Sequence, residues 1–318
     1  MNGDPGVGAA PVYAFAHLSD LHLSTPAALT PREWLGKRAL SYLSWQRKRR
    51  HEYRPDVLDA LRADLAAALP DQILISGDLT QLGQPAECEQ ARRWLESLGD
   101  PLRVALVPGN HDCLLALAAP WAATLGRWQP WLAGDEPAAE SAPFPSLRRR
   151  GPVAFVGLSS AVPTAPLLAT GRLGAKQLAR LESLLVELGR EGRFRVLYLH
   201  HAPVPGADRW RKRLVDAPAL AAIVARAGVE LVLHGHHHRT RDAWLEGPAG
   251  RVPVHGVASA SALGEHGEAA AYSHYRLWVE PEQWRVELDR RRYQRASGTF
   301  VREDVREFSV PRRPAQEP

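Results

Sequence analysis

Apolar segments of strand length alternate with longer segments of helical periodicity along much of the chain. The expected buried strands are residues 12–16, 72–76, 103–107, 153–158, 195–199 and 230–233. Leu and Ala recur at three- and four-residue spacings in the expected helices, which are residues 55–69, 85–98, 174–188 and 216–227. Strands that alternate with helices predict an α/β fold built in layers.

The pattern changes after Arg241, where strand-like segments follow one another with little helix between them. These segments are 242–245, 251–257, 272–279, 284–289 and 292–301. They predict a second, more antiparallel sheet packed on the first. We expect a single domain over residues 12–302, with a surface loop at 134–145 and a C-terminal tail over 303–318, whose proline-rich end from 310 is expected to be disordered.

Composition excludes several classes of protein. The 318 residues can bury a sizeable core, and the two cysteines, Cys88 and Cys113, cannot build a disulfide framework. They fit a reducing compartment, so a cytoplasmic location is expected. No run of about 18 apolar residues predicts a membrane-spanning helix, and residues 1–11 show no secretory signal. The net charge of +5 is spread along the chain, so it gives only a weak indication of anionic partners.

Polar side chains follow the ends of five expected strands. Asp20 and His22 follow the first strand, and on an extended backbone both would point to one side. The other motifs are Gly77-Asp78, Gly109-Asn110-His111-Asp112, His200-His201 and His234-Gly235-His236-His237-His238. Each alone also fits an ordinary turn, a helix cap or a flexible His-rich tract. Because open α/β sheets bind ligands at the C-terminal ends of their strands, the set together predicts a metal-binding site.

These motifs resemble those of the calcineurin-like metallophosphoesterase superfamily over residues 14–239. The matching positions are Asp20, His22, Gly77, Asp78, Gly109, Asn110, His111, Asp112, His200, Gly235, His236 and His238. The resemblance implies an α/β fold, a four-layer α/β/β/α sandwich of two mixed sheets flanked by helices. It also implies two metal ions and hydrolysis of phosphoesters.

The resemblance assigns a role to each matching residue. Asp78 would bridge the two metals; Asp20, His22 and His238 would complete one site, and Asn110, His200 and His236 the other. This mixed imidazole and carboxylate set suits Mn, Fe, Zn, Co or Ni better than Ca. Two such cations about 3.5–4 Å apart clamp a phosphoryl group and lower the pKa of a water, which supplies a metal-bound hydroxide as nucleophile.

The residues beside the ligands are interpreted less directly. His111 is expected to be the catalytic residue that is not a ligand, acting on the bound phosphate or the leaving oxygen. Asp112 either accepts a hydrogen bond from His111 and fixes its tautomer, or caps a helix. His201 competes with His200 as the ligand, although the family pattern favours His200, whereas His234 and His237 are expected to be structural.

An insertion at residues 31–54, here called the cap, follows the first strand. Its apolar and aromatic residues interleave with basic ones, and a second basic-aromatic cluster lies at 209–213. We expect both to flank the metal cleft, where the cap would grip an anionic or lipid-bearing substrate or lie on an anionic membrane surface. The alternative is a solvated helix that covers the core. The cap is similar to segments of bacterial UDP-2,3-diacylglucosamine pyrophosphatases.

The leading hypothesis is a metal-dependent phosphoric ester hydrolase that cleaves a phosphodiester or pyrophosphate bond. A lipid-linked or nucleotide-sugar diphosphate ranks slightly ahead of a cyclic nucleotide as substrate, and contact with the inner membrane face would follow from the lipid. A nuclease is a weaker alternative, because no nucleic-acid-binding domain is visible. A non-catalytic scaffold is weaker still, because every ligand position is filled.

Overall fold

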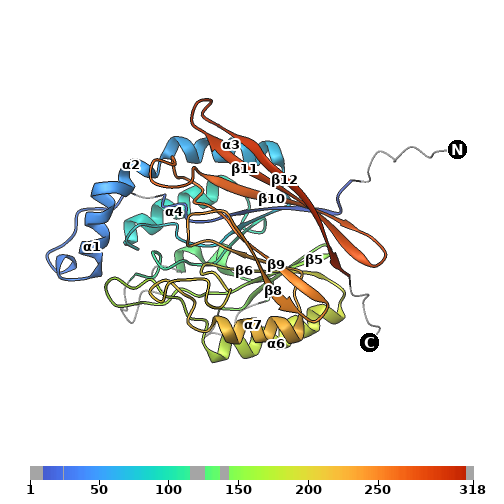
Figure 1. The fold of residues 1–318 in the computed structure, drawn as a ribbon. Helices are drawn as coiled ribbons and strands as arrows, with labels where there is room; N and C mark the ends of the chain where they lie inside the picture. The colour runs from blue at the N-terminus through green and yellow to red at the C-terminus, as the bar shows by residue number, and fades with distance from the viewer. Residues whose placement is uncertain (1–9, 24, 115–125, 137–142, 313–318) are drawn as a thin grey trace.

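The computed structural model describes residues 10–23, 25–114, 126–136 and 143–312. Two six-stranded sheets pack face to face, and helices cover their outer faces (Figure 1). This arrangement confirms the predicted α/β sandwich of two mixed sheets flanked by helices.

The first sheet has the strand order β12-β11-β10-β1-β2-β3. Its strands are β1 (Tyr13–Leu18), β2 (Gln72–Ile75), β3 (Val104–Leu106), β10 (Ala271–Val279), β11 (Gln283–Gln294) and β12 (Thr299–Pro311). The strands β1, β2 and β3 are parallel, whereas β10, β11 and β12 are antiparallel to their neighbours. The helices α3 (Pro55–Ala68) and α4 (Pro85–Leu98) bury apolar side chains in the core of this sheet.

The second sheet has the order β4-β5-β6-β7-β9-β8. Its strands are β4 (Ser146–Arg150), β5 (Val153–Gly157), β6 (Phe194–Leu199), β7 (Leu231–His234), β8 (Arg241–Gly247) and β9 (Gly250–Gly256). The run β5-β6-β7-β9 is parallel, and the edge strands β4 and β8 are antiparallel. The helices α6 (Ala175–Arg190) and α7 (Ala217–Ala227) pack on it through rows of leucine, alanine and valine.

Aromatic side chains join the two sheets. The ring of Phe15 on β1 stacks on Tyr275 of β10 at 4.8 Å and meets the edge of Phe155, from the other sheet, at 5.3 Å between ring centroids. Phe194 and Trp284 make a second contact between the sheets at 5.5 Å. Burying each such ring stabilises the fold by about 1.5–3 kcal/mol. The parallel strands of both sheets are thereby held rigidly next to one another.

Two sequence predictions about the C-terminal part of the chain are wrong. The strands after Arg241 do not form a sheet of their own, because β8 and β9 extend the second sheet while β10, β11 and β12 extend the first. Residues 303–311 belong to β12 and not to a tail, since β12 pairs with β11 along its whole length, up to Pro311 opposite Gln283. Pro311 is tolerated because it is the last residue of an edge strand. Residues 313–318 lie outside the described part of the chain.

The cap consists of short helices at one end of the sandwich, in blue at the left of Figure 1. They are a 3₁₀ turn (Glu33–Leu35), α1 (Lys37–Ser44), a π-helical turn (Trp45–Arg49) and α2 (Arg50–Glu52). A further 3₁₀ turn (Gly126–Trp128) and α5 (Gln129–Leu132) lie beside β3. Across the residues that the structure describes, none of the helices has the length and apolarity needed to cross a bilayer.

Candidate metal centre

The C-terminal ends of the central parallel strands bring the predicted ligands together. Asp20 and His22 follow β1, Asp78 follows β2, and His238 follows β7 in the other sheet. One potential ligand atom from each of these four side chains lies within 4.8 Å of the others. Three of the four side chains are buried, and His238 is partly exposed. The first half of the predicted donor set is therefore assembled.

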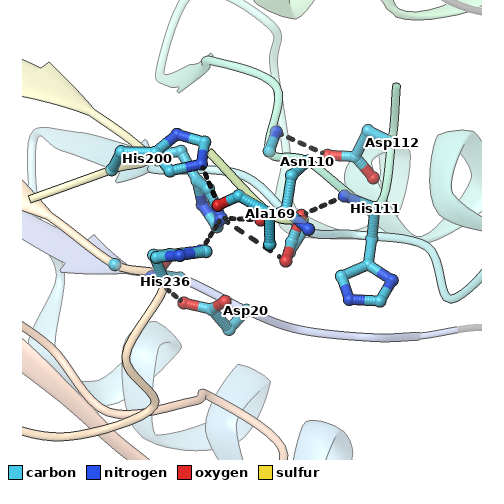
Figure 2. Close-up of polar contacts among 12 residues, drawn as sticks. Asp20, Asn110, His111, Asp112, Ala169, His200 and His236 are labelled. Atoms are coloured by element: carbon cyan, nitrogen blue, oxygen red, sulfur yellow. Dashed lines mark hydrogen bonds and ion pairs between the residues drawn. The ribbon is translucent and has the colours of Figure 1, made fainter. Parts of the chain in front are cut away.

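The second half of the set lies beside it (Figure 2). The Nε2 atom of His200 is 3.2 Å from Oδ1 of Asn110, 3.2 Å from Nδ1 of His236 and 3.4 Å from Oδ2 of Asp78. Asp78 thus contacts this group and also belongs to the first. That is the position which the family resemblance gives to the bridging carboxylate.

Five of these ligands have a backbone conformation that ordinary residues avoid. Their φ angles are 54° at Asp20, 45° at His22, 55° at Asp78, 70° at His236 and 53° at His238. Asp20 and His22 therefore do not lie on an extended backbone, as the prediction assumed, although their side chains do reach the same cluster. Left-handed conformations at non-glycine residues cost about 1–3 kcal/mol each and cluster at functional sites. Here the loops that follow the strands, rather than the strands themselves, aim the ligands.

Backbone hydrogen bonds hold these loops in place. The N–H of Asp20 donates to the carbonyl of Gly77 at 2.9 Å, and the N–H of His22 donates to that of Asp78 at 3.0 Å. The hydroxyl of Ser259 donates to the carbonyl of Asp20 at 2.6 Å. The loops after β1 and β2 therefore stay fixed against one another.

Two glycines leave the space that the carboxylates need. A Cβ atom on Gly109 would collide with the side chain of Asp78, and one on Gly235 would collide with Ser19 and Asp20. The absence of side chains at these positions, rather than unusual φ angles, explains the Gly-Asn and Gly-His parts of the motifs.

Carbonyl groups orient the ligand imidazoles. Nδ1 of His22 donates to the carbonyl of Thr80 at 3.0 Å, and Nδ1 of His200 donates to that of Ser76 at 2.7 Å. For His238, the hydroxyl oxygen of Tyr53 lies 2.9 Å from Nδ1. Such partners fix which ring nitrogen remains available to a metal. In all three rings Nε2 is the atom that faces the cluster.

The donor set fits divalent cations. The Nε2 atom of His236 is buried and has no hydrogen-bond partner within the described part of the chain, and Nε2 of His22 faces Nε2 of His238 at 3.4 Å. Nδ1 of His236 faces Nε2 of His200 at 3.2 Å, and imidazole nitrogens that face one another at such distances match ligands that share a cation. The imidazole, amide and carboxylate groups are those expected for Mn, Fe, Zn, Co or Ni.

The electrostatics of the cluster keep its carboxylates charged. Burial raises the pKa of Asp78, but the neighbouring His200 and His111 outweigh it and hold that pKa well below its usual value. Burial also raises the pKa of Asp20, but the nearby His238 outweighs this effect, so the pKa of Asp20 is lowered as well. Burial lowers the pKa of His22 and of His236, so both rings are neutral at pH 7. An ionised carboxylate and a neutral imidazole are the forms that bind metal.

His111 lies at the edge of the cluster but is held differently from the prediction. Its Nδ1 donates to the carbonyl of Gln81 at 2.6 Å, and its Nε2 accepts from the guanidinium of Arg49 at 3.0 Å. Burial and the charge of Arg49 lower the pKa of His111 to about 4. A backbone carbonyl, and not Asp112, therefore sets the tautomer of His111.

Asp112 instead ties two loops together. Its Oδ1 accepts hydrogen bonds from the N–H groups of Leu79 and Thr80 and from the Thr80 hydroxyl, each at 3.0 Å. Its Oδ2 accepts from the N–H of Gly109 at 2.9 Å. The predicted contact with the His111 ring is wrong, because both carboxylate oxygens are used in this way. The alternative helix cap concerns residues 115–125, which lie outside the described part of the chain.

The competing histidines point elsewhere. Nδ1 of His201 lies 2.8 Å from the Ser160 hydroxyl and its Nε2 lies 3.3 Å from the carbonyl of Ala169. Nε2 of His237 lies 2.8 Å from Oδ1 of Asp208, and Nδ1 of His234 contacts the carbonyl of Gly235 at 3.0 Å. Of the adjacent pair, His200 is therefore the residue that faces the cluster.

The end of the cap contributes two residues that sequence reasoning did not single out. Arg49 contacts His111, and Tyr53 contacts His238 and lies 4.5 Å from the His22 ring. Arg49 belongs to the basic segment at 47–50, so the sequence showed its charge but not its contact with His111. No motif marked Tyr53.

Both basic segments reach one loop, at residues 164–171. Lys37 of the cap donates to the carbonyl of Leu168 at 2.9 Å. From the cluster at 209–213, the carbonyls of Arg211 and Arg213 accept from Ala169 and Gly171 at 2.8 and 3.1 Å. This loop also places the Ala169 carbonyl beside His201. The two basic segments are thus connected through it.

A second group of potential ligands comprises Glu52, Glu265 and His266. Glu52 already accepts a hydrogen bond from the N–H of Gly264 at 2.8 Å and contacts His266 at 3.2 Å. Glu265 and His266 are exposed. This group joins the cap to the loop before β10, and it was not predicted.

An α/β sandwich whose strand ends carry carboxylate, amide and imidazole ligands in two adjoining groups defines the class of binuclear metalloproteins. The chain belongs to the calcineurin-like phosphoesterase family, since the model of that family matches residues 13–240. The family resemblance proposed from the motifs is thereby confirmed.

Curated relatives and solved structures agree with this assignment. The chain is 30% identical to a probable cyclic nucleotide phosphodiesterase of Synechococcus sp. over 59% of its own length and 64% of the relative's. It is 30% identical to a 3′,5′-cyclic-nucleotide phosphodiesterase of Nostoc sp. over 57% of its own length and 59% of the relative's. The matches thus span about three-fifths of these relatives.

The fold is shared with a solved dimetal phosphatase from Danio rerio. The TM-score is 0.58 at 13% identity, and the match covers 95% of this chain and 99% of that one. At this identity the likeness concerns the fold alone.

Proposed function

We infer that this protein is a binuclear metal-dependent phosphoric ester hydrolase that cleaves phosphodiester bonds, and that cyclic nucleotides are its substrate class. The observation that carries the inference is the convergence of six side chains, from both sheets, around Asp78. The names of the curated relatives support the choice of substrate. This choice reverses the order that the sequence alone favoured.

Different residues of this chain would have different roles in such a reaction. When bound, two divalent cations polarise the phosphoryl group and lower the pKa of a water. Asp20, His22 and His238 would hold one cation, Asn110, His200 and His236 the other, and Asp78 both. His111, fixed through Nδ1 by the carbonyl of Gln81, would donate from Nε2 to a leaving oxygen in its protonated form, once Arg49 has moved away from that nitrogen. Asp112 acts as a positioning residue that holds the loops carrying Asp78 and Asn110 together.

A metal-screened hydrolysis panel tests the proposal. Purified protein is incubated with Mn²⁺, Fe²⁺, Zn²⁺, Co²⁺ or Ni²⁺ and with bis-p-nitrophenyl phosphate, cyclic AMP, cyclic GMP or UDP-diacylglucosamine. We expect metal-dependent release of p-nitrophenol and of the 5′-nucleotide. Asp78→Asn weakens both metal sites and should lower both rates by at least about a hundredfold. Absence of hydrolysis with every metal would overturn the proposal.

A lipid-linked nucleotide diphosphate is the second candidate substrate, and the outer face of the cap favours it. The side chain of Leu35 is 92% exposed, and Trp34 and Leu40 are about half exposed. The cap also carries the exposed basic residues Arg47 and Lys48, and helices that contact an anionic membrane combine exposed apolar and basic residues in this way. With this substrate, we would expect the protein to lie in the cytoplasm and to contact the inner membrane face. Release of UMP from UDP-diacylglucosamine without cyclic AMP hydrolysis would select it.

A further inference from the structure

A cavity of about 260 Å³ lies between the cap and the metal centre. Its lining includes His22, in the metal centre, and Trp45, Arg49, Arg50, Tyr53 and Arg54 from the end of the cap. One wall is therefore a metal ligand, and the opposite wall is the end of the cap. A molecule held in this cavity would touch the metal centre.

The cavity carries positive charge on its cap side. Three arginines line it, Arg49, Arg50 and Arg54. Arg54 pairs with Asp56 at 3.0 Å, whereas Arg49 contacts the Nε2 atom of His111. A guanidinium that meets an imidazole can exchange that contact for a stronger, charge-assisted bond to a phosphoryl oxygen. Arg49 is thus placed to bind the anionic end of a substrate.

The same cavity offers aromatic surface. Trp45 stands in the π-helical turn with its ring 5.6 Å from that of Tyr42, and Tyr53 lies against the His22 ring. Turns of π-helix are frequent at functional sites. Aromatic faces of this kind suit a flat aromatic group such as a base.

We propose that this cavity is a nucleotide subsite, in which Arg49 binds the phosphate and Trp45 stacks on the base. The proposal rests on the proposed function, since the metal centre must hold the scissile phosphoryl group. Base stacking on aromatic rings is strong and tolerates different bases. An acyl chain fits this cavity poorly, because three guanidinium groups line it.

Calorimetry on the metal-loaded protein separates the two halves of the subsite. The probes are AMP and ribose 5-phosphate, which share a phosphate and differ in the base. Wild-type protein should bind AMP about tenfold more tightly than ribose 5-phosphate. Trp45→Leu should remove this difference, whereas Trp45→Phe should restore most of it. Arg49→Gln should weaken binding of both probes by about the same factor, tenfold or more.

Trp244→Leu is the matched control, because Trp244 lies on β8, is 49% exposed and does not line the cavity. It should leave the affinity of both probes unchanged. Equal affinity of wild-type protein for AMP and ribose 5-phosphate would overturn the subsite. So would a preference for AMP that survives Trp45→Leu.

Hydrolysis assays distinguish failure of this inference from failure of the proposed function. If the protein cleaves phosphodiesters but shows no preference for AMP, the activity stands and the subsite falls. If it cleaves no substrate of the panel but shows a preference for AMP that Trp45→Leu removes, the subsite is supported and the proposed activity is rejected. Cyclic AMP kinetics of an active protein should show a raised KM in Trp45→Leu, with kcat within about twofold of wild type.

Discussion

The strand-end loops and the cap contribute to the same centre in contrasting ways. The loops are buried, tied by backbone hydrogen bonds, and strained at five ligand positions. The cap is largely exposed, is built of short helices and reaches the centre through Arg49 and Tyr53. The contrast agrees with the proposed function, in which the loops would hold the metals and the cap would bind the substrate.

The largest effect should come from disturbing a loop. In Gly109→Ala the new methyl group collides with the Asp78 side chain, so the carboxylate that we propose as the ligand of both metals must move. We expect affinity for Mn²⁺, measured by calorimetry, to fall by about a hundredfold.

Gly267→Ala is the control for that variant, because no described atom lies within 4 Å of the Cβ that it adds. It should bind Mn²⁺ like wild type. Wild-type affinity in Gly109→Ala as well would show that the loops are not as rigid as this account requires.

A smaller effect is expected where the cap supports a ligand. Tyr53→Phe keeps the ring against His22 but removes the oxygen that lies 2.9 Å from Nδ1 of His238. Loss of such a partner typically weakens metal binding by about tenfold or more. Tyr42→Phe, in the same cap, is the comparison, and it should not change Mn²⁺ affinity. Equal Mn²⁺ affinities in the two variants would show that the cap does not contribute to metal binding.

The smallest effect should come from the outer face of the cap. Leu35→Ser changes a side chain that is 92% exposed, so kcat/KM for cyclic AMP should stay within about twofold of wild type. Its binding to anionic vesicles would decrease only if this face contacts a membrane. A larger loss of cyclic AMP hydrolysis would mean that the outer face takes part in the reaction with small substrates.

The sequence predicts the loops better than the cap for a physical reason. Strand ends meet at one edge of a sheet whatever the details of packing, so Asp20, Asp78 and His236 could be placed together from their positions alone. The left-handed loop conformations could not be foreseen, because they depend on contacts such as that of Ser259 with Asp20. Arg49 and Tyr53 were missed because their roles depend on how the cap folds back.

The antiparallel strands show a similar limit. Their alternating pattern predicted strands in this part of the chain, but the expected strands at 284–289 and 292–301 miss the turn at 295–298 between β11 and β12. The pattern also does not say which sheet a strand joins. That choice depends on long-range pairs such as β1 with β10 and β7 with β9. The role of Asp112 was likewise hidden, since its partners Leu79 and Thr80 lie in another loop.

Anomalous diffraction from crystals grown with Mn²⁺ tests the central claim most directly. The account predicts two peaks about 3.5–4 Å apart, one ligated by Asp20, His22 and His238, the other by Asn110, His200 and His236, with Asp78 touching both. A single peak in this centre, or peaks only at Glu52, Glu265 and His266, would contradict it.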